Sequence, residues 1–335
     1  MQRKEFMSKA LLAGGSLLAA GTANALPGTR KTLPATDAAV SAPATDAAGS
    51  TIATDKAGSA PAAGTPFHLN YGIHDGMFRN LGGPVFTDQI KFAYEQGFRA
   101  IEDNGMMDRP PEEQARIGET LQQLGMTMGV FVLNFDHWPV STSLCSGDPV
   151  WLDKFLHACH DAIDTAARCH GKWITVVPGN YDHRLAMGYQ TTHVIHALRK
   201  ACEILEPHGL IMVLEALSDT PELFLRHPDQ TYMICEAVNS PSCQYLFDMY
   251  HMQRNEGDLI PNLDRAWDHI AYLQIGDNPG RKEPGTGEMN YHNIFKHIYQ
   301  KGYKGVLGME HGMAGTGADG EKALIKAYRE ADDFV

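Results

Sequence analysis

Four side chains with oxygen donors lie near the carboxyl ends of four short apolar runs in the second half of the chain. They are Glu215, Asp248, Gln274 and Glu310. Runs of this length and composition predict buried parallel strands. A carboxylate late in a buried strand is costly unless it is paired or serves a site. Four such polar residues in succession favour a site.

The spacing of these four residues predicts that they converge. Successive members are roughly 30 residues apart, about the length of one βαβ repeat, so they could occupy four consecutive strands and meet at one mouth of the sheet. Three carboxylates and one amide oxygen form an all-oxygen donor set, which suits Mg²⁺ or Mn²⁺ and is poor for zinc or copper. The sequence therefore predicts one divalent ion, Mg²⁺ or Mn²⁺, held by these four residues. The alternative is four unrelated polar residues, two of them neutralised by ion pairs.

The elements that would position this site alternate between strand-like and helix-like segments from residue 66 onward, which is typical of a parallel α/β fold. Strands are expected at 67–73, 99–102, 127–134, 173–178, 210–217, 245–251, 270–276 and 305–312. Helices are expected at 87–96, 111–124, 149–169, 190–207, 229–239, 258–268, 290–301 and 319–333. Eight such units predict a single (β/α)8 TIM barrel over residues 66–335. A doubly wound open sheet is the alternative, but no GxGxxG turn follows the first strand.

In a barrel of this kind the loops after the strands build the site. His137 and Trp138 follow the third strand, and we expect them to contact substrate, with the indole forming an apolar wall that sheds water. Residues after the other strands, such as Glu102 and Asn104, are expected to form hydrogen bonds or line walls rather than to act as catalysts.

The first 65 residues differ in composition from the rest. Basic residues precede a short apolar run at 10–20, and Ala23-Asn24-Ala25 forms an A-x-A cleavage site, which predicts an export signal peptide over 1–25 and a periplasmic protein. The signal is compatible with the Sec route or a twin-arginine-like route. Its apolar run is too short to span a bilayer stably, so no membrane span is expected in the mature protein. Residues 26–65 are rich in Ala, Thr, Pro and Ser and predict a disordered linker.

Composition narrows the classes of partner. The 335 residues are 43% hydrophobic and 20% charged, as in ordinary soluble proteins. The net charge of −12 disfavours a nucleic-acid partner. Six cysteines without a CxxC pair are more consistent with small buried hydrophobic residues than with a disulfide framework. A small-molecule substrate is expected, and a homo-oligomer stays possible.

Two stretches carry a resemblance to a known family. They read FDMYHMQRNEGD over residues 247–258 and QIGDNPGRKEPGTGEMNY over 274–291. These stretches resemble the hydroxypyruvate isomerase branch of the xylose-isomerase-like TIM barrels, a group of sugar isomerases and epimerases. The resemblance implies that the four oxygen donors are the metal ligands and that the outer two, Glu215 and Glu310, are the general bases. It also implies that His251 and Arg281 bind substrate.

The expected function is therefore that of a metal-dependent isomerase of a small hydroxy-keto acid or sugar. Such an enzyme is an intramolecular oxidoreductase of the aldose-ketose type, and works by proton transfer through an enediolate. Two departures from the branch concern the substrate: Ala-Leu-Ser follows Glu215 where Pro-Ile-Asn is usual, and His follows Glu310 where Tyr is usual.

Because of these departures, an exported 3-keto-glycoside lyase or a ketose epimerase on the same metal site is the enzymatic alternative. A non-catalytic carbohydrate-binding barrel is a third possibility. The DNA-repair branch of the family needs a His-rich zinc cluster and a basic groove, and the sequence has neither.

Overall fold

The structure is a computed structural model that describes residues 63–135 and 142–335. The predicted signal peptide (1–25) and all but the last three residues of the predicted linker (26–65) lie outside the described residues. His137 and Trp138 lie outside them as well. The following account concerns the described residues only.

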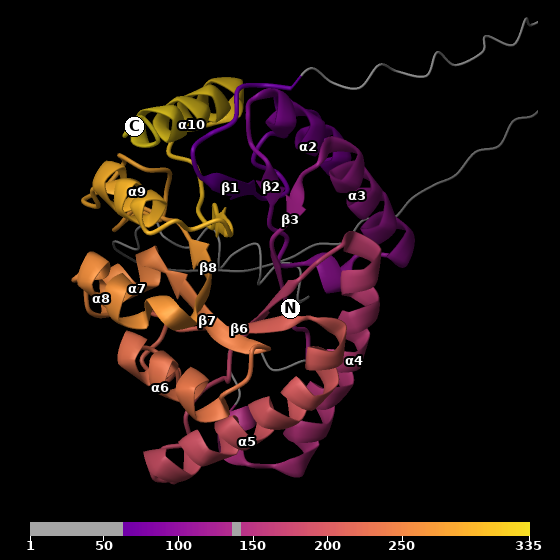
Figure 1. The fold of residues 1–335 in the computed structure, drawn as a ribbon, viewed down its shortest axis with the longest axis vertical. Helices are drawn as coiled ribbons and strands as arrows, with labels where there is room; N and C mark the ends of the chain where they lie inside the picture. Colours follow the sequence, from indigo (N-terminus) through magenta and orange to yellow (C-terminus); the bar gives the residue numbers. More distant parts are fainter. Residues whose placement is uncertain (1–62, 136–141) are drawn as a thin grey trace, which may run out of the picture. The chain divides into compact units, whose positions relative to one another are not determined.

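The strands form one parallel sheet that closes into a barrel, with the helices around it (Figure 1). The strand order is β3-β2-β1-β9-β8-β7-β6-β5-β4. The strands are β1 (Asn70–Ile73), β2 (Ala100–Ile101), β3 (Thr127–Met128), β4 (Val130–Val132), β5 (Trp173–Val176), β6 (Ile211–Glu215), β7 (Cys243–Asp248), β8 (Ile270–Gln274) and β9 (Val306–Gly308). Only Gly129 separates β3 from β4, so the two edges of the sheet belong to one predicted strand. The predicted TIM barrel is confirmed.

Gly129 interrupts that strand at a place where a side chain would not fit. A Cβ atom there would lie 2.2 Å from the hydroxyl of Tyr272 and 2.6 Å from the backbone oxygen of Ile101. Tyr272 comes from β8 and is fully buried, and its hydroxyl donates a hydrogen bond of 2.9 Å to Glu102 on the far side of the barrel. The absence of a side chain at position 129 therefore makes room for a tyrosine that crosses the barrel interior.

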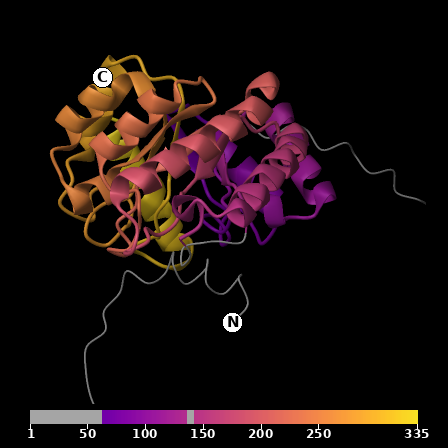
Figure 2. The same ribbon diagram turned by 90° about the horizontal axis from the view of Figure 1, so that it is seen from below.

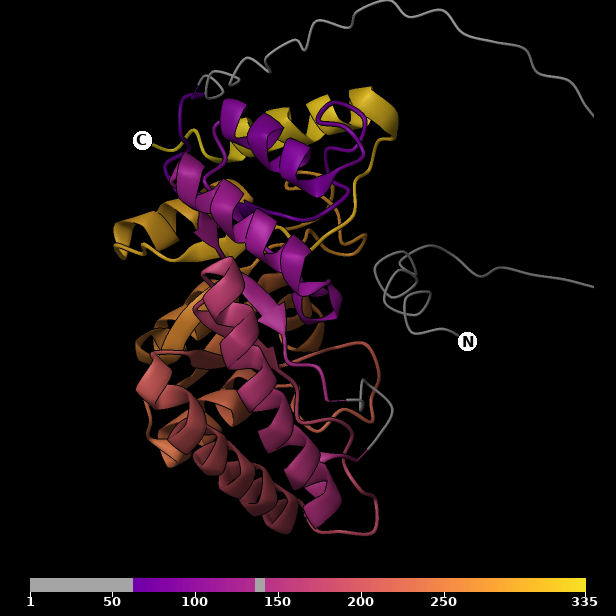
Figure 3. The ribbon, with the colours of Figure 1, turned by 90° about the vertical axis from the view of Figure 1, so that its right-hand side faces the viewer.

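The helices agree with the predicted segments to within a few residues. They are α2 (Phe86–Glu95), α3 (Pro111–Leu124), α4 (Pro149–Cys169), α5 (Met187–Leu205), α6 (Pro228–Val238), α8 (Leu259–Ala266), α9 (Tyr291–Gln300) and α10 (Gly317–Ala331). Figure 3 shows α2, α3 and α4 side by side, and Figure 2 shows α4 against α5. The ends of α3 follow from sequence: Pro111 begins it, and Gly125 ends it with a left-handed φ of 63°.

One helix was not predicted. The sequence predicts one strand over residues 245–251, but β7 ends at Asp248 and helix α7 (Met249–Asn255) begins directly after it. The Asp248 carboxylate accepts hydrogen bonds from the backbone N–H groups of Tyr250 (2.8 Å) and His251 (3.2 Å), which is the usual way an aspartate starts a helix. The prediction that the strand continues to His251 is therefore wrong, and this histidine lies in the first turn of α7.

Strand alternation divides the apolar core into two parts, because successive side chains point to opposite faces of a sheet. Side chains such as Ile73, Phe131 and Phe247 belong to the large core that the helices share. A smaller cluster belongs to the barrel interior: Ala100, Val130, Val213, Leu246, Tyr272 and Val306. Glu215, Asp248 and Gln274 each lie two residues after a member of the interior cluster. They therefore face into the barrel at its carboxyl end.

Other sequence expectations concern the cysteines and the membrane. All six cysteines are buried, and none forms a disulfide. Between residues 63 and 335, with 136–141 left aside, no helix is both long and apolar enough to cross a membrane.

We predict that Gly129→Ala lowers the free energy of unfolding by about 1–3 kcal/mol, because the added methyl group overpacks the interior against Tyr272. Denaturant unfolding followed by circular dichroism measures this. The matched control is Gly188→Ala at the start of α5, where an added Cβ meets nothing within 4 Å and should leave stability unchanged or raise it by up to about 1 kcal/mol. Equal stabilities for the two variants would contradict the interior packing described above.

Candidate active site

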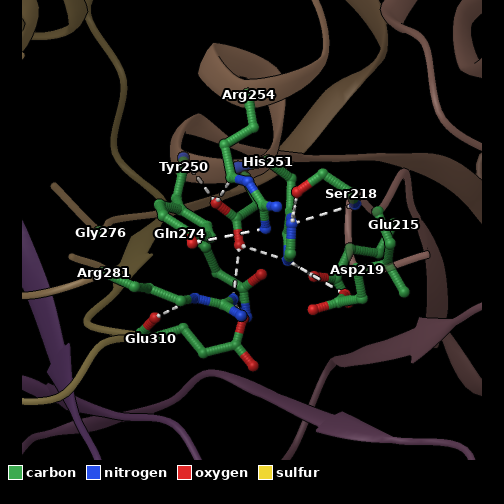
Figure 4. A network of polar contacts seen from close by, with 12 residues as sticks. Glu215, Ser218, Asp219, Tyr250, His251, Arg254, Gln274, Gly276, Arg281 and Glu310 are labelled. Carbon is green, nitrogen blue, oxygen red and sulfur yellow. Dashed lines mark hydrogen bonds and ion pairs between the residues drawn. The ribbon is translucent and has the colours of Figure 1, made fainter. Parts of the chain in front are cut away.

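The four predicted oxygen donors lie at the carboxyl end of the barrel. Glu215, Asp248 and Gln274 are the last residues of β6, β7 and β8, and Glu310 follows β9 by two residues. Glu215, Asp248 and Gln274 are buried, and the Glu310 side chain is 11% exposed. Figure 4 shows Gln274 and Glu310 near Arg281, with Glu215 beside His251. The structure thus brings the predicted residues to one place.

Arg281 joins two of these carboxylates. Its guanidinium donates to Asp248 at 3.0 Å and to Glu310 at 2.9 Å, and its Nε donates to the backbone oxygen of Glu310 at 3.0 Å. The guanidinium also lies over the ring of Tyr250, 5.0 Å from its centroid. The predicted substrate-binding arginine is therefore held among the carboxylates themselves.

The loop that carries Arg281 is fixed by a buried aspartate. The Asp277 carboxylate accepts hydrogen bonds from the backbone N–H groups of Gly285, Gly287 and Met289, at 2.9 to 3.1 Å. The Arg281 N–H donates to the Asp277 backbone oxygen at 2.7 Å, and Arg281 adopts a left-handed φ of 49°. This folding turns the guanidinium back into the barrel mouth.

His251 is oriented by Ser218. The backbone N–H of Ser218 donates to Nδ1 of His251 at 3.2 Å, and the Ser218 hydroxyl lies 2.8 Å from the same nitrogen (Figure 4). Because a backbone N–H can only donate, Nδ1 accepts and the neutral ring carries its proton on Nε2. Burial, with the nearby charges of Arg281 and Arg254, lowers the pKa of His251 well below its ordinary value, so the ring is neutral.

The Nε2 atom of His251 is aimed at carboxylates without reaching one. It lies 3.6 Å from Asp248 and 3.8 Å from Glu215, and it has no hydrogen-bond partner. In the tautomer set by Ser218 this nitrogen is a donor. It is therefore suited to bond an oxygen atom of a bound substrate rather than to bind a metal.

Buried negative charge dominates the electrostatics of the site. Burial, reinforced by Glu310 and Asp248, raises the pKa of Glu215 well above its ordinary value. Burial also raises the pKa of Asp248, although Arg281 opposes the shift. Burial raises the pKa of Glu310 to about 7, again against Arg281. A cation among these groups would relieve the cost of burying their charges.

The donor set fits a divalent cation on two observations. Carboxylate oxygens of Glu215 and Asp248 lie within 4.8 Å of each other, and a nitrogen of His251 lies in the same cluster without being available as a ligand in the tautomer that Ser218 sets. In addition, Oε1 of Gln274 is buried without a hydrogen-bond partner, although a buried amide oxygen normally has one. Glu310 does not belong to this cluster. Its carboxylate accepts hydrogen bonds from Arg281 and Asn104 instead.

Asn104 and Glu102, which the sequence predicts as hydrogen-bonding or wall residues without naming their partners, bond two of the four oxygen donors. Asn104 donates to Oε1 of Glu310 at 2.8 Å, and Glu102 accepts a hydrogen bond of 2.7 Å from the side-chain nitrogen of Gln274. Glu102 follows the interior residue Ala100 by two positions, so strand alternation could have placed it inside the barrel.

A cleft opens next to Glu310, at the neighbouring residues Asn104 and His311. It has a volume of about 760 Å³, and its walls include His74, Arg79, Asn104 and His311. Pockets that hold whole small ligands measure roughly 300–1,000 Å³. The cleft therefore has room for a ligand larger than a three-carbon acid.

The raised pKa of Glu310 gives a pH-dependent stability for the metal-free protein. A folded pKa of about 7 against an ordinary 4.5 means that the contribution of Glu310 is full below pH 4.5 and is lost as the pH rises to about 7. The glutamine of Glu310→Gln stays neutral at every pH. Between pH 4.5 and about 7 we therefore expect the free energy of unfolding of this variant to rise relative to that of the wild type, by on the order of 3 kcal/mol. Guanidinium unfolding in EDTA at several pH values measures this. The control is Glu119→Gln, a change at an exposed residue of α3. Its free energy of unfolding should change with pH as that of the wild type does. The same parallel behaviour in Glu310→Gln would contradict a buried charge at position 310.

Comparisons of sequence find isomerases. The chain is 36% identical to hydroxypyruvate isomerase of Escherichia coli (strain K12) over 120 residues, which are 35% of this chain and 46% of that enzyme. It thus spans about half the length of this relative. It is 27% identical to 2-oxo-tetronate isomerase of Cupriavidus necator over 237 residues, which are 70% of this chain and 90% of that enzyme.

Comparisons of structure find the same fold. An AP endonuclease of family 2 from Brucella melitensis matches with a TM-score of 0.66 and 23% identity, over 76% of this chain and 96% of that one. The 3-keto-D-glucoside 4-epimerase from E. coli matches with a TM-score of 0.65 and 18% identity, over 78% and 98%. The profile of one family matches residues 90–331, which is most of the described barrel. The chain belongs to the xylose isomerase-like TIM barrel family.

Proposed function

We propose that this protein is a metal-dependent isomerase of a small hydroxy-keto acid or sugar. The observation that carries the proposal is the convergence of Glu215, Asp248, Gln274 and Glu310 at the carboxyl end of the barrel, with the Gln274 oxygen buried and unpaired. The hydroxypyruvate and 2-oxo-tetronate isomerases among its relatives support an isomerase of this general kind. The net charge of −12 argues against DNA as substrate.

The proposed cation would be Mg²⁺ or Mn²⁺, held by the four oxygen donors. When bound, it would polarise the adjacent carbonyl and hydroxyl oxygens of a substrate and so acidify the C–H bond between them. A hard cation with oxygen ligands matches three carboxylates and one amide.

The proton would be moved by the two outer glutamates, Glu215 and Glu310. Removal of the proton at one carbon and its return at the neighbouring carbon exchange an aldehyde for a ketone. The pKa of about 7 for Glu310 in the metal-free protein is compatible with a carboxyl group that both takes and gives a proton near neutrality.

Two further groups would bind the substrate. Arg281 already uses Nε and Nη2 to bond Glu310 and Asp248, so its Nη1 would bond a carboxylate or hydroxyl oxygen of the substrate. His251 presents an N–H that is oriented by Ser218 and free to bond a carbonyl oxygen. These assignments rest on the orientation of the two side chains toward the carboxylates.

A larger sugar is the second candidate substrate, and the cleft beside Glu310 favours it. Its volume of about 760 Å³ exceeds the need of a three-carbon acid. A ketose epimerase or a 3-keto-glycoside lyase would use the same removal of a proton next to a carbonyl group, followed by return on the opposite face or by loss of a leaving group.

We predict that the full chain binds one Mn²⁺ or Mg²⁺ and that Asp248→Asn weakens this binding. The affinity for the ion should fall by more than the roughly 10–100-fold that follows removal of a residue that only hydrogen-bonds to a metal ligand. Asparagine still starts a helix, so α7 should persist. Isothermal titration calorimetry gives the affinity. The control is Asp219→Asn, an exposed acid near His251, which should bind the ion as the wild type does. Equal affinities for Asp248→Asn and the wild type would reject the ligand assignment.

We also predict that the reaction in D₂O places deuterium on the carbon next to the carbonyl group, because the transferred proton exchanges with solvent on the carboxyl group. Glu310→Gln, with bound metal confirmed by elemental analysis, should react roughly 10²–10⁴-fold more slowly. Proton NMR and mass spectrometry follow the label. Product without solvent deuterium, together with normal turnover by Glu310→Gln, would exclude proton transfer and make a hydride shift the next mechanism to test.

A further inference from the structure

We infer that Glu102 is a positioning residue that fixes the side-chain amide of Gln274 with its oxygen toward the cation. The inference rests on the proposed function in one respect, that Gln274 is a metal ligand. Glu102 itself is not among the proposed ligands. It acts from inside the barrel, through a hydrogen bond to a residue that is.

Glu102 is a fully buried carboxylate at the centre of the barrel. Its Oε1 accepts a hydrogen bond from Nε2 of Gln274 at 2.7 Å, and its Oε2 accepts one from the Tyr272 hydroxyl at 2.9 Å. Nε2 of His74 lies 2.9 Å from Oε1. Two side chains of β8 thus hold one carboxylate by hydrogen bonds, and His74 lies close to it without a hydrogen bond at Nε2.

The direction of the Gln274 amide follows from the chemistry of its partner. A carboxylate oxygen accepts hydrogen bonds, so the amide must turn its nitrogen to Glu102. The amide oxygen then points the other way, and this is the oxygen that is buried without a partner. Without Glu102, the amide could turn over and present its N–H groups, which repel a cation. Glu102 therefore selects the face of Gln274 that can bind a metal ion before the ion arrives.

The barrel reserves space for this carboxylate. A Cβ atom at Gly308 on β9 would lie only 1.6 Å from Oε2 of Glu102 and 2.6 Å from its carboxyl carbon. Gly308 pairs directly with Gln274 across the β8–β9 ladder. The position next to Gln274 therefore lacks a side chain, and Glu102 from β2 occupies the space.

The test exchanges donor and acceptor between the two residues. In Glu102→Leu, Gln274 and Tyr272 both lose their acceptor, so the Gln274 amide is no longer held in one direction. We expect the dissociation constant for Mn²⁺ to rise about 10–100-fold. In the double variant Glu102→Gln, Gln274→Glu, the hydrogen bond re-forms with its direction reversed, and a carboxylate oxygen faces the cation. We expect its affinity to return to the wild-type value or to exceed it.

The matched control is Tyr272→Phe, which removes the other hydrogen bond to Glu102 and leaves the one to Gln274. We expect a lower melting temperature with an unchanged dissociation constant. Isothermal titration calorimetry with Mn²⁺ and a melting curve, both on the full chain, give the two quantities. A double variant as weak as Glu102→Leu, or a Glu102→Leu protein that binds Mn²⁺ as the wild type does, would overturn the inference.

The experiment distinguishes failure of the proposed function from failure of the inference about Glu102. A wild type that binds no Mn²⁺ removes the proposed function, whatever the variants do. If Glu102→Leu does not fold, the wild-type protein provides the test. With ¹⁵N-labelled glutamine, the side-chain N–H protons of Gln274 should exchange slowly with water both with and without Mg²⁺. Rapid exchange would show that Glu102 does not hold the amide.

Discussion

Buried negative charge at the carboxyl end of the barrel is the constraint on which the site depends. Three carboxylates meet there, and burial raises the pKa of each. Arg281 offsets part of this charge, and it can do so only because Asp277 folds its loop back over the mouth. The fixed loop, the oriented arginine and the raised pKa values of the three carboxyl groups are thus parts of one electrostatic arrangement.

Polar groups inside the barrel extend this arrangement below the mouth. Glu102 and Tyr272 cross an interior that is otherwise apolar, and they fit because Gly129 and Gly308 contribute no side chain. Small barrels fill their interior with layers of side chains. Here one layer is a hydrogen-bonded network, and it connects the packing of the interior to the direction of the Gln274 amide.

Much of the barrel could be predicted from sequence, because eight apolar runs alternate with helical segments and both have strong periodicity. Gln274 and its three partners were found because each ends such a run. The strand was extended past Asp248 because an apolar run does not show where a side chain will cap a helix. Glu102 was found but not assigned a role, since its partners are 170 and 172 residues away in the chain and only the closed barrel brings them together. His137 and Trp138 stay predictions.

Asp248 divides its two oxygen atoms between the fold and the site. One starts helix α7, and the other faces Arg281 and His251. Two independent requirements therefore act on this residue. A descendant that had abandoned the chemistry would still need a side-chain oxygen at this position, from aspartate or asparagine, to start the helix. The side-chain oxygen of Gln274, in contrast, forms no hydrogen bond that supports the fold. On the proposed ligand assignment, a side chain without a donor atom at position 274 would remove a ligand from the site, whereas an aspartate at position 248 alone would not show that the site still binds a cation.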